Sequence, residues 1–523
     1  MANGVVYLVG AGPGDPGLMT VTGWQLIRTA DIILYDGLCN EAILRWARKD
    51  CVLQCVGKRG HGGHWTQKQI DDLIVDSARK YARVVRLKGG DTSVFARTTE
   101  EVERLATEGI PFRIVPGLTV ALAASAYTGI PITHRDWSSS VALVTGQLQS
   151  NDGCTDTEEP LNWSGLAQFP GTLVMYMGVR KAKEWSQQLI AAGKPPTTPV
   201  AMIRRCSWPD QQVLRCELAQ VAETLAVHPD FRPPIISIIG DVVQAETPNC
   251  WFTAQPLFGQ TWVITSPYEQ ASKLEDRIRE LGGQPILSPA LHVVDPVDWD
   301  TVDASIASMN TTDWIVFSSS VGVSRFFHRV SVLGKDSRIF GRTRLAAVGQ
   351  ATADTLRTYG LHCDLVPDGE AGAEGLSNKL LPLVNDKRVV IVRSPEGRRV
   401  LEERLAGVAT QVHVAVAYRQ MPVSAWDEEV LQVAQASSQS MPSQSARHPT
   451  WWTATSSNIA TQACRLLGRE AADVAWLSIS PAVTETLRSL GCQHVLTSAS
   501  PDFASMIQTA IDWREASLQP PPE

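Results

Sequence analysis

Short apolar segments alternate with amphipathic segments along almost the whole chain, and this pattern restricts the fold more than any other feature. Early examples are VVYLVG at 5–10, DIILYD at 31–36, RVVRL at 83–87 and FRIVPG at 112–117. Such segments are short, rich in β-branched residues and bounded by glycine, proline or aspartate, which is typical of buried strands. Because helical patterns fill the intervals, the sequence predicts α/β layers with largely parallel sheets.

One of the predicted helices runs from Thr99 to Glu108. The run Thr98-Thr99-Glu100-Glu101 has the spacing of a capping box, and Gly109 suits the helix C-terminus.

The length of 523 residues predicts several domains, with the main boundary in the segment 251–260.

The net charge of −7 argues against a nucleic-acid-binding protein, which usually carries a basic surplus. An anionic small substrate remains compatible with this charge, because a pocket can be basic in an acidic protein.

The ten cysteines are scattered and form no CxxC pair, which is typical of free thiols in a reducing compartment. The N-terminus lacks the pattern of a secretory signal, and no apolar run reaches the length of a membrane span. The sequence therefore predicts a cytoplasmic protein that does not enter a membrane.

The glycine-rich segment GAGPGDPG at 10–17 follows the first predicted strand and allows more than one interpretation. A dinucleotide-binding loop would use Asp36 as its ribose ligand, but Asp15 stands where that motif needs glycine. Two prolines also remove backbone donors, and the helix begins only near Thr20. A strained turn without a ligand is the other local interpretation.

Seven further motifs follow in order. They are VGKRGH (56–61), VVRLKGGD (84–91), VPGLT (115–119), GIPITHRDW (129–137), VMYMGV (174–179), VAMIRR with PDQ (200–211) and PPIISIIGDVV (233–243). Together with 10–17 they resemble the tetrapyrrole methylases, in the branch that methylates uroporphyrinogen III.

This resemblance implies S-adenosyl-L-methionine as methyl donor, held in a shaped crevice at strand ends rather than in a phosphate cradle. The positions that match the donor site of the family are Pro13, Gly89, Gly90, Asp91, Val94, Thr119, Val120, Met177 and Cys206. No metal is expected, because His61 and His64 have no further ligands at metal spacing.

The implied acceptor is an octacarboxylate macrocycle, which requires convergent arginine and lysine side chains. The candidates are Arg59, Arg86, Lys88, Arg97, Arg135, Arg204 and Arg205, and for each the alternative is a solvated surface charge.

The resemblance further implies Asp36 as proton acceptor and Lys58 as proton donor, with Arg97 and Glu100 as a pair at the acceptor pocket. A strand-end cap is the alternative for Asp36. The loop GGDTSVFARTTEE (89–101) departs from the usual GGDPFxFGRGGEE of the family, which predicts a stiffer backbone.

The second half contains a faint internal repeat: 313–327 followed by 346–360 resembles 449–462 followed by 476–491. No glycine-rich phosphate loop, nucleophile elbow or metal motif occurs there. The residues alone predict a two-lobed α/β protein with an interlobe cleft.

Several diffuse motifs in order extend this interpretation. They are TWVITSP (261–267), VFSSSVGV (316–323), AAVGQATA (346–353), GAEGL (372–376), IVRSPEGRRVL (391–401) and VAYRQ (416–420). This order resembles uroporphyrinogen-III synthase, which implies cyclisation of hydroxymethylbilane with loss of water. Tyr418 matches the candidate proton donor, and Ser318, Ser319, Thr352 and Ser456 would bind carboxylates together with backbone donors of turns.

The expected fold is therefore α/β, with an N-terminal two-lobed tetrapyrrole methylase fold followed by a two-lobed α/β uroporphyrinogen-III synthase fold. The methyltransferase would span 1–252, in lobes of about 1–137 and 138–252. The synthase would span 258–518, with 258–291 and 422–518 in one lobe and 292–421 in the other.

The expected function is bifunctional: synthesis of uroporphyrinogen III and its methylation to precorrin-2, on the sirohaem or cobalamin branch. The expected partners are small-molecule tetrapyrroles and a second copy of the chain, as a homodimer through the methyltransferase half. One alternative is an active methyltransferase with a degenerate or regulatory, tetrapyrrole-binding second half. Another is a nicotinamide-dependent dehydrogenase.

Overall fold

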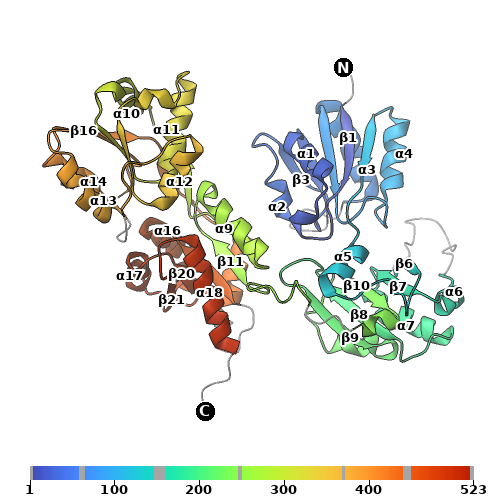
Figure 1. Ribbon diagram of the computed structural model, residues 1–523. Coiled ribbons are helices and arrows are strands. Elements are labelled where there is room, and N and C mark those ends of the chain that lie inside the picture. The colour runs from blue at the N-terminus through green and yellow to red at the C-terminus, as the bar shows by residue number, and fades with distance from the viewer. Residues whose placement is uncertain are drawn as a thin grey trace, which may run out of the picture. The chain divides into compact units, whose positions relative to one another are not determined.

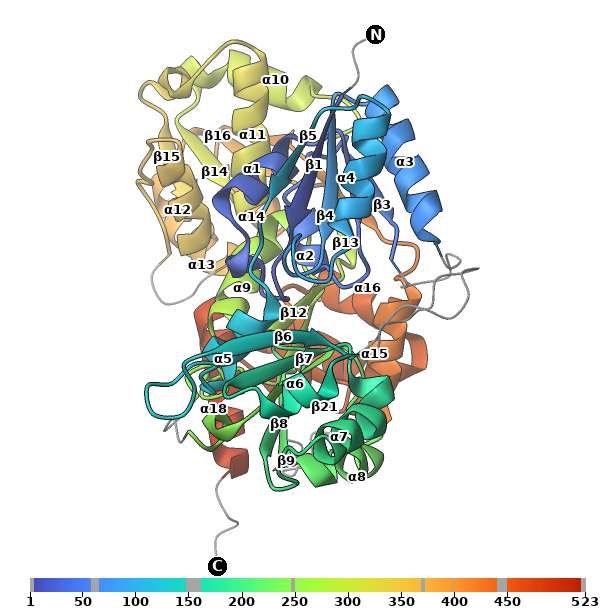
Figure 2. The ribbon, with the colours of Figure 1, turned by 90° about the vertical axis from the view of Figure 1, so that its right-hand side faces the viewer.

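Five β-sheets organise the described part of this computed structural model (Figures 1 and 2). The structure describes residues 4–57, 65–146, 161–245, 250–367, 372–397, 399–439 and 449–518. The chain divides into two compact units, Met1–Phe258 and Gly259–Glu523. No helix within these described ranges is long and apolar enough to cross a lipid bilayer.

The first sheet of the first unit has five strands, all paired in parallel. In spatial order they are β3 (Val52–Cys55), β2 (Ile32–Tyr35), β4 (Arg83–Lys88), β1 (Val5–Gly10) and β5 (Phe112–Val115). The four strands predicted from 5–10, 31–36, 83–87 and 112–117 are confirmed, with small differences at their ends.

Helices cover both faces of this sheet. They are α1 (Val21–Thr29), α2 (Glu41–Leu44), α3 (Gln67–Lys80) and α4 (Thr98–Thr107), with α1 and α2 on one side and α3 and α4 on the other (Figure 1). Leu8 and Leu34 pack in the core that contains Ile74 of α3, whereas Val9 and Ile33 face the opposite core. A sheet buried on both faces explains why its strands are apolar almost throughout.

The second sheet of this unit is mixed, so the expectation of largely parallel sheets is wrong here. Its strands, in spatial order, are β6 (Val141–Thr145), β7 (Thr172–Tyr176), β10 (Ile235–Ile239), β8 (Pro199–Arg204) and β9 (Gln212–Glu217). Only β6 and β7 pair in parallel. The turn between β8 and β9 is short, and a short connection permits only antiparallel neighbours.

Four helices accompany this second sheet, and two of them cover its opposite faces. They are α5 (Val120–Thr128), α6 (Trp163–Gln168), α7 (Ala182–Ala191) and α8 (Val221–Ala226). Ala121 and Ala124 of α5 pack in the core with Ile238, while Trp185 and Leu189 of α7 pack in the other core. Helix α5 starts directly after the loop that follows β5, so it connects the two sheets of the unit.

One sheet of the second unit joins segments that lie far apart in the sequence. Its parallel strands are β12 (Gln284–Leu287), β11 (Thr261–Ile264), β19 (Thr450–Ala454), β20 (Ala475–Ser478) and β21 (His494–Thr497). Its helices are α9 (Tyr268–Glu280), α15 (Glu428–Gln439), α16 (Ser457–Leu467), α17 (Pro481–Ser489) and α18 (Phe503–Leu518). Trp262 of β11 is in register with Trp451 of β19.

The other parallel sheet of the second unit is formed by the intervening chain. Its strands are β15 (Arg344–Ala347), β14 (Trp314–Phe317), β16 (Arg388–Arg393) and β17 (Gln411–Val416). Its helices are α10 (Asp300–Ala307), α11 (Ser320–Val332), α12 (Gln350–Thr358), α13 (Ala373–Leu380) and α14 (Val400–Ala406). The antiparallel pair β13 (Leu291–Val294) and β18 (Arg419–Pro422) carries the chain into and out of this region.

The internal repeat corresponds to two copies of one local structure, β14–α11–β15–α12 and β19–α16–β20–α17. Ser319 caps α11 with φ −165° and ψ 157°, and Ser456 caps α16 with φ −160° and ψ 160°. Each serine hydroxyl accepts a hydrogen bond from a first-turn amide, of Gly322 and Ile459 respectively. The Ser-rich turns therefore stand at equivalent places, after the carboxyl end of a parallel strand.

Candidate functional site

The glycine-rich turn after β1 is used for close backbone packing. Gly12 and Gly90 exchange two backbone hydrogen bonds, with N···O distances of 3.1 and 2.9 Å. Asp15 accepts a hydrogen bond from the amide of Gly17 at 2.8 Å, and its other oxygen accepts one from the Tyr127 hydroxyl at 2.7 Å. Asp15, which stands where a dinucleotide motif needs glycine, therefore links this turn to α5. This agrees with the argument against a phosphate loop.

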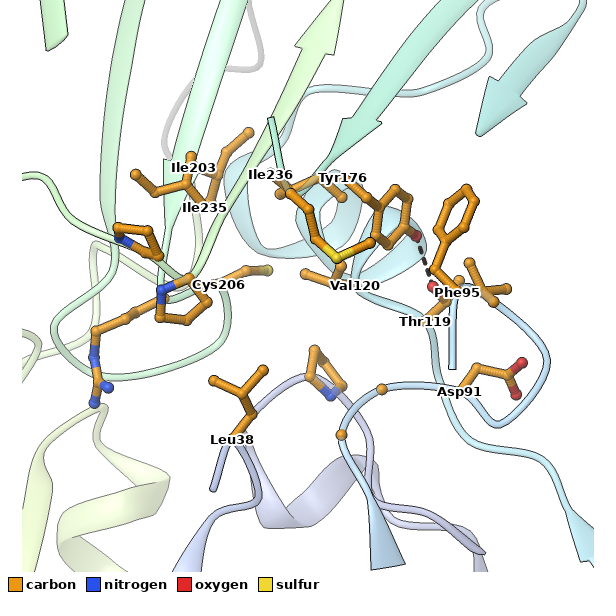
Figure 3. A pocket seen from close by; sticks show the side chains of 18 of the residues that line it. Leu38, Asp91, Phe95, Thr119, Val120, Tyr176, Ile203, Cys206, Ile235 and Ile236 are labelled. Carbon is orange, nitrogen blue, oxygen red and sulfur yellow. Dashed lines mark hydrogen bonds between the residues drawn. The ribbon is translucent and has the colours of Figure 1, made fainter. Parts of the chain in front are cut away.

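A cavity of about 460 Å³ lies in the first unit, where loops after β1 and β4 meet the second sheet (Figure 3). All nine residues predicted for the donor site line it: Pro13, Gly89, Gly90, Asp91, Val94, Thr119, Val120, Met177 and Cys206. They come from loops at the strand ends of both sheets and, in the case of Val120, from the first residue of α5. The structure thus brings together residues that span nearly two hundred positions of the sequence.

Asp91 shapes the cavity wall through backbone contacts. One carboxylate oxygen accepts a hydrogen bond from the Ser93 amide at 2.7 Å, and the other accepts one from the Gly117 amide at 2.9 Å. These bonds tie the loop after β4 to the loop after β5. In Figure 3 the carboxylate is directed away from the centre of the cavity, consistent with these backbone partners.

Tyr176 is a cavity residue that the sequence motifs did not single out. Its hydroxyl lies 2.7 Å from Oγ1 of Thr119 and accepts a hydrogen bond from the Ala121 amide at 3.2 Å (Figure 3). Its ring centroid is 5.0 Å from that of Phe95. Burial raises the pKa of Tyr176, so the hydroxyl stays neutral. The sequence feature that could have indicated Tyr176 as a cavity residue is its place directly before Met177, at the end of β7.

Other lining residues were not predicted for the donor site, although several of them stand within the quoted motifs. They include Leu38, Phe95, Val179, Arg180, Ile203, Trp208 and the segment 233–236. Most are apolar, and apolar residues at strand ends are indistinguishable in sequence from core residues.

Left-handed backbone conformations concentrate at this cavity. Of the six non-glycine residues with positive φ in the described ranges, five lie on or beside its wall: Phe95, Arg97, Met177, Arg205 and Ser207. Such conformations are costly and cluster at functional sites. Cys206 lies between Arg205 and Ser207 in the chain and is 4 % exposed. Burial raises the pKa of its thiol to about 12. The thiol therefore contributes a neutral, apolar surface.

Next to the cavity, four charged side chains form a buried network. Arg86 donates from Nη2 to Oδ1 of Asp36 at 2.5 Å and from Nε to Oε1 of Glu101 at 3.1 Å. Lys88 donates to the other oxygen of Glu101 at 2.5 Å. The Gly89 amide donates to Oδ2 of Asp36 at 3.4 Å. Asp36 is thus held directly behind a residue of the cavity wall.

This network corrects the interpretation of Arg86 and Lys88, since neither is a surface charge free to meet an acceptor. Each is 3 % exposed, and Glu101 is 1 % exposed. Burial alone would lower the pKa of Arg86. The carboxylates of Asp36 and Glu101 together have the larger effect, so the pKa of Arg86 is raised. Burial lowers the pKa of Lys88 despite the opposing effect of Glu101.

The predicted capping box at the start of α4 is wrong. The N-cap is Arg97, with φ 54°, and no side chain caps the helix. Glu101 is engaged in the buried network instead, and the Thr98 hydroxyl donates to the Thr92 carbonyl. Arg97 pairs with Glu100 at 2.6 Å, and both side chains are more than 40 % exposed. The Arg97–Glu100 pair is therefore brought together as expected.

The remaining candidates of the first unit differ in their surroundings. Arg204 and Arg205 both pair with Asp210, at 3.3 and 2.6 Å, and Arg205 also lines the cavity. Arg135 is exposed. Four residues lie outside the described ranges: Lys58, Arg59, His61 and His64. Among the residues that the structure describes, no group of three potential metal ligands gathers.

In the second unit, two predicted residues meet. Tyr418 lies between β17 and β18, is 4 % exposed, and places its hydroxyl 2.9 Å from Oγ of Ser319. The pKa of Tyr418 is raised by burial, although hydrogen bonds with Ser319 and Ser394 oppose this. The phenol therefore holds its proton at neutral pH. Ser394 was not foreseen, and its position after β16 in the motif IVRSPEGRRVL was the available signal.

The other predicted hydroxyls of this unit stand apart. Ser318 donates to the Val392 carbonyl at 3.0 Å, and Thr352 is buried in the first turn of α12. Ser456 caps α16. In the described ranges no hydrogen bond joins Thr352 or Ser456 to Tyr418. The backbone carbonyl of Glu396 accepts a hydrogen bond from the Asn458 side chain at 3.3 Å.

Two family models match the chain. The model of tetrapyrrole (corrin/porphyrin) methylases matches residues 5–222, and the model of uroporphyrinogen-III synthase HemD matches residues 272–508.

Several curated proteins are similar over long stretches. Uroporphyrinogen-III C-methyltransferase of Bacillus subtilis (strain 168) is 38 % identical over 371 residues, which cover 71 % of this chain and 75 % of that protein. Porphyrin biosynthesis protein HemD of Ruminiclostridium josui is 32 % identical over 383 residues, 73 % of this chain and 75 % of that protein. Siroheme synthase 1 of Yersinia enterocolitica is 46 % identical over 264 residues, and only 53 % of that protein is covered.

Among solved structures, a uroporphyrin-III C-methyl transferase from Thermus thermophilus complexed with S-adenyl homocysteine is 37 % identical to this chain. It covers 46 % of this chain and 99 % of its own length, with a TM-score of 0.39.

Proposed function

Since this chain belongs to the tetrapyrrole methylases over its first half and to the uroporphyrinogen-III synthases over its second, we propose that it is a bifunctional enzyme of tetrapyrrole biosynthesis. Its second half cyclises hydroxymethylbilane to uroporphyrinogen III. Its first half methylates that product to precorrin-2, using S-adenosyl-L-methionine. One activity supplies the substrate of the other, which is a chemical reason for their fusion.

The observation that carries this proposal is the cavity of the first unit, whose lining includes all nine residues expected at the methyl-donor site. Its volume of about 460 Å³ suits a nucleoside-sized ligand, because ligand sites usually measure roughly 300–1,000 Å³. Gly90 has φ +73°, and a Cβ there would meet no atom within 4 Å. The wall at Gly90 therefore leaves space that a side chain would fill and that a bound ligand can use.

S-adenosyl-L-methionine supplies an electrophilic methyl group on a sulfonium centre when it is bound. The neutral walls made by Cys206 and Tyr176 and the backbone of Gly89 and Gly90 bind and orient the donor in this proposal. Proximity and orientation of the two reactants supply most of the acceleration. A proton must leave the macrocycle once its ring carbon has gained the methyl group, and Asp36 accepts it.

The acceptor binds through cationic side chains that remain accessible. Arg97 at the start of α4 is exposed and pairs with Glu100, and Arg205 lines the cavity. In this proposal Arg59 and Arg135 bind acceptor carboxylates, and Lys58 donates a proton. Guanidinium groups suit this task because they bind carboxylates through two parallel hydrogen bonds.

In the second half, Tyr418 donates a proton to the leaving hydroxyl of hydroxymethylbilane. The position of Tyr418 supports this role, because its hydroxyl lies 2.9 Å from Oγ of Ser319, a residue expected to bind substrate. Ser318, Ser319, Thr352 and Ser456 bind substrate carboxylates at the ends of parallel strands, together with backbone amides of the adjoining turns.

The methylation half of the proposal is tested by incubating the full chain with uroporphyrinogen III and methyl-labelled S-adenosyl-L-methionine. The expected product carries two labelled methyl groups. Absence of label transfer, with the chain folded, would contradict the assignment.

We also propose that the chain works in the cytoplasm as a homodimer formed through the methyltransferase half. Light scattering of the purified chain tests whether it is a dimer.

A further inference from the structure

A buried network of charges requires a reason beyond stability. A buried ion pair is often no more stabilising than apolar side chains of similar volume, because desolvation offsets the attraction. Here two cations and one carboxylate, those of Arg86, Lys88 and Glu101, are at most 3 % exposed. Asp36 is the member of the network that reaches solvent, with a side chain 30 % exposed.

The geometry fixes the orientation of Asp36. Every nitrogen of the Arg86 guanidinium is engaged: Nη2 with Asp36, Nε with Glu101, and Nη1 with the backbone carbonyls of Leu34 and Leu87. An arginine held at all three nitrogens cannot rotate, so the carboxylate it binds is held in one position.

Glu101 of the network lies in the first turn of α4, next to the exposed Arg97–Glu100 pair. Glu100 faces outward and pairs with Arg97, whereas the next residue, Glu101, faces inward. Because Arg86 and Lys88 are two apart on β4, they lie on one face of the sheet, and Glu101 bridges both. The first turn of α4 is thereby connected through Arg86 to the carboxylate of Asp36.

We propose that Glu101 is a positioning residue for methyl transfer, which acts through Arg86 to hold the Asp36 carboxylate against the cavity wall at Gly89. This inference rests on the proposed role of Asp36 as proton acceptor. Among the described residues, the buried thiol of Cys39 also lies close to Asp36, and burial strongly raises its pKa, so it stays neutral beside the carboxylate.

A double-mutant cycle on the full chain tests this proposal. The single-turnover rate of methyl transfer and the KM for uroporphyrinogen III are measured for the unaltered chain, Glu101→Gln, Asp36→Asn and the double variant. Glu101→Gln is expected to lower the rate about tenfold and to leave KM within about twofold, because positioning acts on the chemical step. In the Asp36→Asn background, Glu101→Gln is expected to have no further effect.

A matched control is available on the same helix. Glu108 ends α4 at its far end and also bridges two arginines, Arg79 at 2.6 Å and Arg104 at 3.0 Å. Glu108→Gln is expected to leave the rate of methyl transfer unchanged.

Equal losses from Glu101→Gln in both backgrounds would overturn the proposal, because a general structural effect is additive. An unchanged rate for Glu101→Gln alone would overturn it too. If Asp36→Asn itself keeps the full rate, the proposed role of Asp36 fails, and the positioning role falls with it. Should Glu101→Gln not fold, Lys88→Met/Glu101→Gln removes a cation together with the anion, and the same comparison applies.

Discussion

The candidate sites of the two units are formed by different kinds of structure. In the first unit the candidate site is a defined cavity, with left-handed turns in its wall and a fully paired charge network behind it. In the second unit the candidate residues are hydroxyls at the ends of parallel strands, and a hydrogen bond joins two of them, Ser319 and Tyr418. The first site is built largely by backbone, and the second by side chains on turns.

This difference explains why the two halves are recognised so unequally from sequence. A turn that needs a left-handed residue restricts which amino acid can occupy it, so Gly90, with φ +73°, leaves a specific motif. A serine at a helix N-terminus can be exchanged for threonine, aspartate or asparagine, so it leaves a diffuse one.

The largest expected effect tests the charge network of the first unit. Asp36→Asn is expected to reduce methylation about a thousandfold, because it removes the proposed proton acceptor. Donor binding should change little. Rates are measured with saturating donor. Asp31→Asn is the control: Asp31 precedes the same strand and also pairs with an arginine, Arg48 at 2.9 Å, away from the site. Equal losses for both variants would contradict the account.

The second prediction concerns the hydroxyl pair of the other unit. Tyr418→Phe should lower formation of uroporphyrinogen III from hydroxymethylbilane about a hundredfold, because it removes the candidate acid. Methylation of added uroporphyrinogen III should be unaffected. Tyr359→Phe, at a half-exposed ring stacked on Phe327, serves as the control. Full synthase activity in Tyr418→Phe would remove the tyrosine from the mechanism.

The third prediction tests whether backbone shape builds the first site. Gly90→Val should weaken S-adenosyl-L-methionine binding about thirtyfold, because a β-branched residue is strained at φ +73° and its side chain enters the cavity. Titration calorimetry measures this. Gly109 has φ +65° and equally open surroundings, but it lies after α4 and outside the cavity. Gly109→Val should lower thermal stability without changing donor affinity.

A smaller effect is expected at the aromatic wall. Tyr176→Phe deletes the hydroxyl that bonds Thr119 and the Ala121 amide, and a neutral hydrogen bond contributes about 0.5–1.5 kcal/mol. Donor affinity should therefore fall about fivefold. A variant that binds the donor as tightly as the unaltered chain would show that this hydroxyl does not shape the site.

The smallest effect on activity is expected at Cys206. Its neutral thiol has no proposed chemical role, so Cys206→Ala should keep methylation within about twofold. Its pKa rises from 9.0 to about 12 on burial, so folding favours the protonated thiol. The free energy of unfolding should fall as pH rises from about 9 to 12, and Cys206→Ala should show a shallower fall. Chemical denaturation across this range measures the difference.

Much of the fold could be predicted because the signals for its strands and helices are local. Strand β1 was predicted at its observed bounds from β-branched residues closed by glycine. The nine cavity residues were predicted from the resemblance to the tetrapyrrole methylases, as the positions that match the donor site of that family. Tyr176 was missed, since an aromatic residue at a strand end has the same pattern whether it lines a cavity or a core.

The charge network could not be predicted, because its partners come from three separate elements. In sequence Arg86 and Lys88 resemble surface cations, and Glu101 fits a capping box equally well. Only packing of α4 against β4 turns Glu101 inward. The mixed second sheet was likewise missed, since strand direction depends on the connection rather than on the strand residues.

The most direct test of the central claim is to incubate the full chain with hydroxymethylbilane, with and without S-adenosyl-L-methionine, and to separate the products. The account predicts the type III isomer of uroporphyrinogen without the donor and dimethylated precorrin-2 with it. Formation of only the spontaneous type I isomer without the donor would contradict it, and would assign the second half a regulatory or degenerate role.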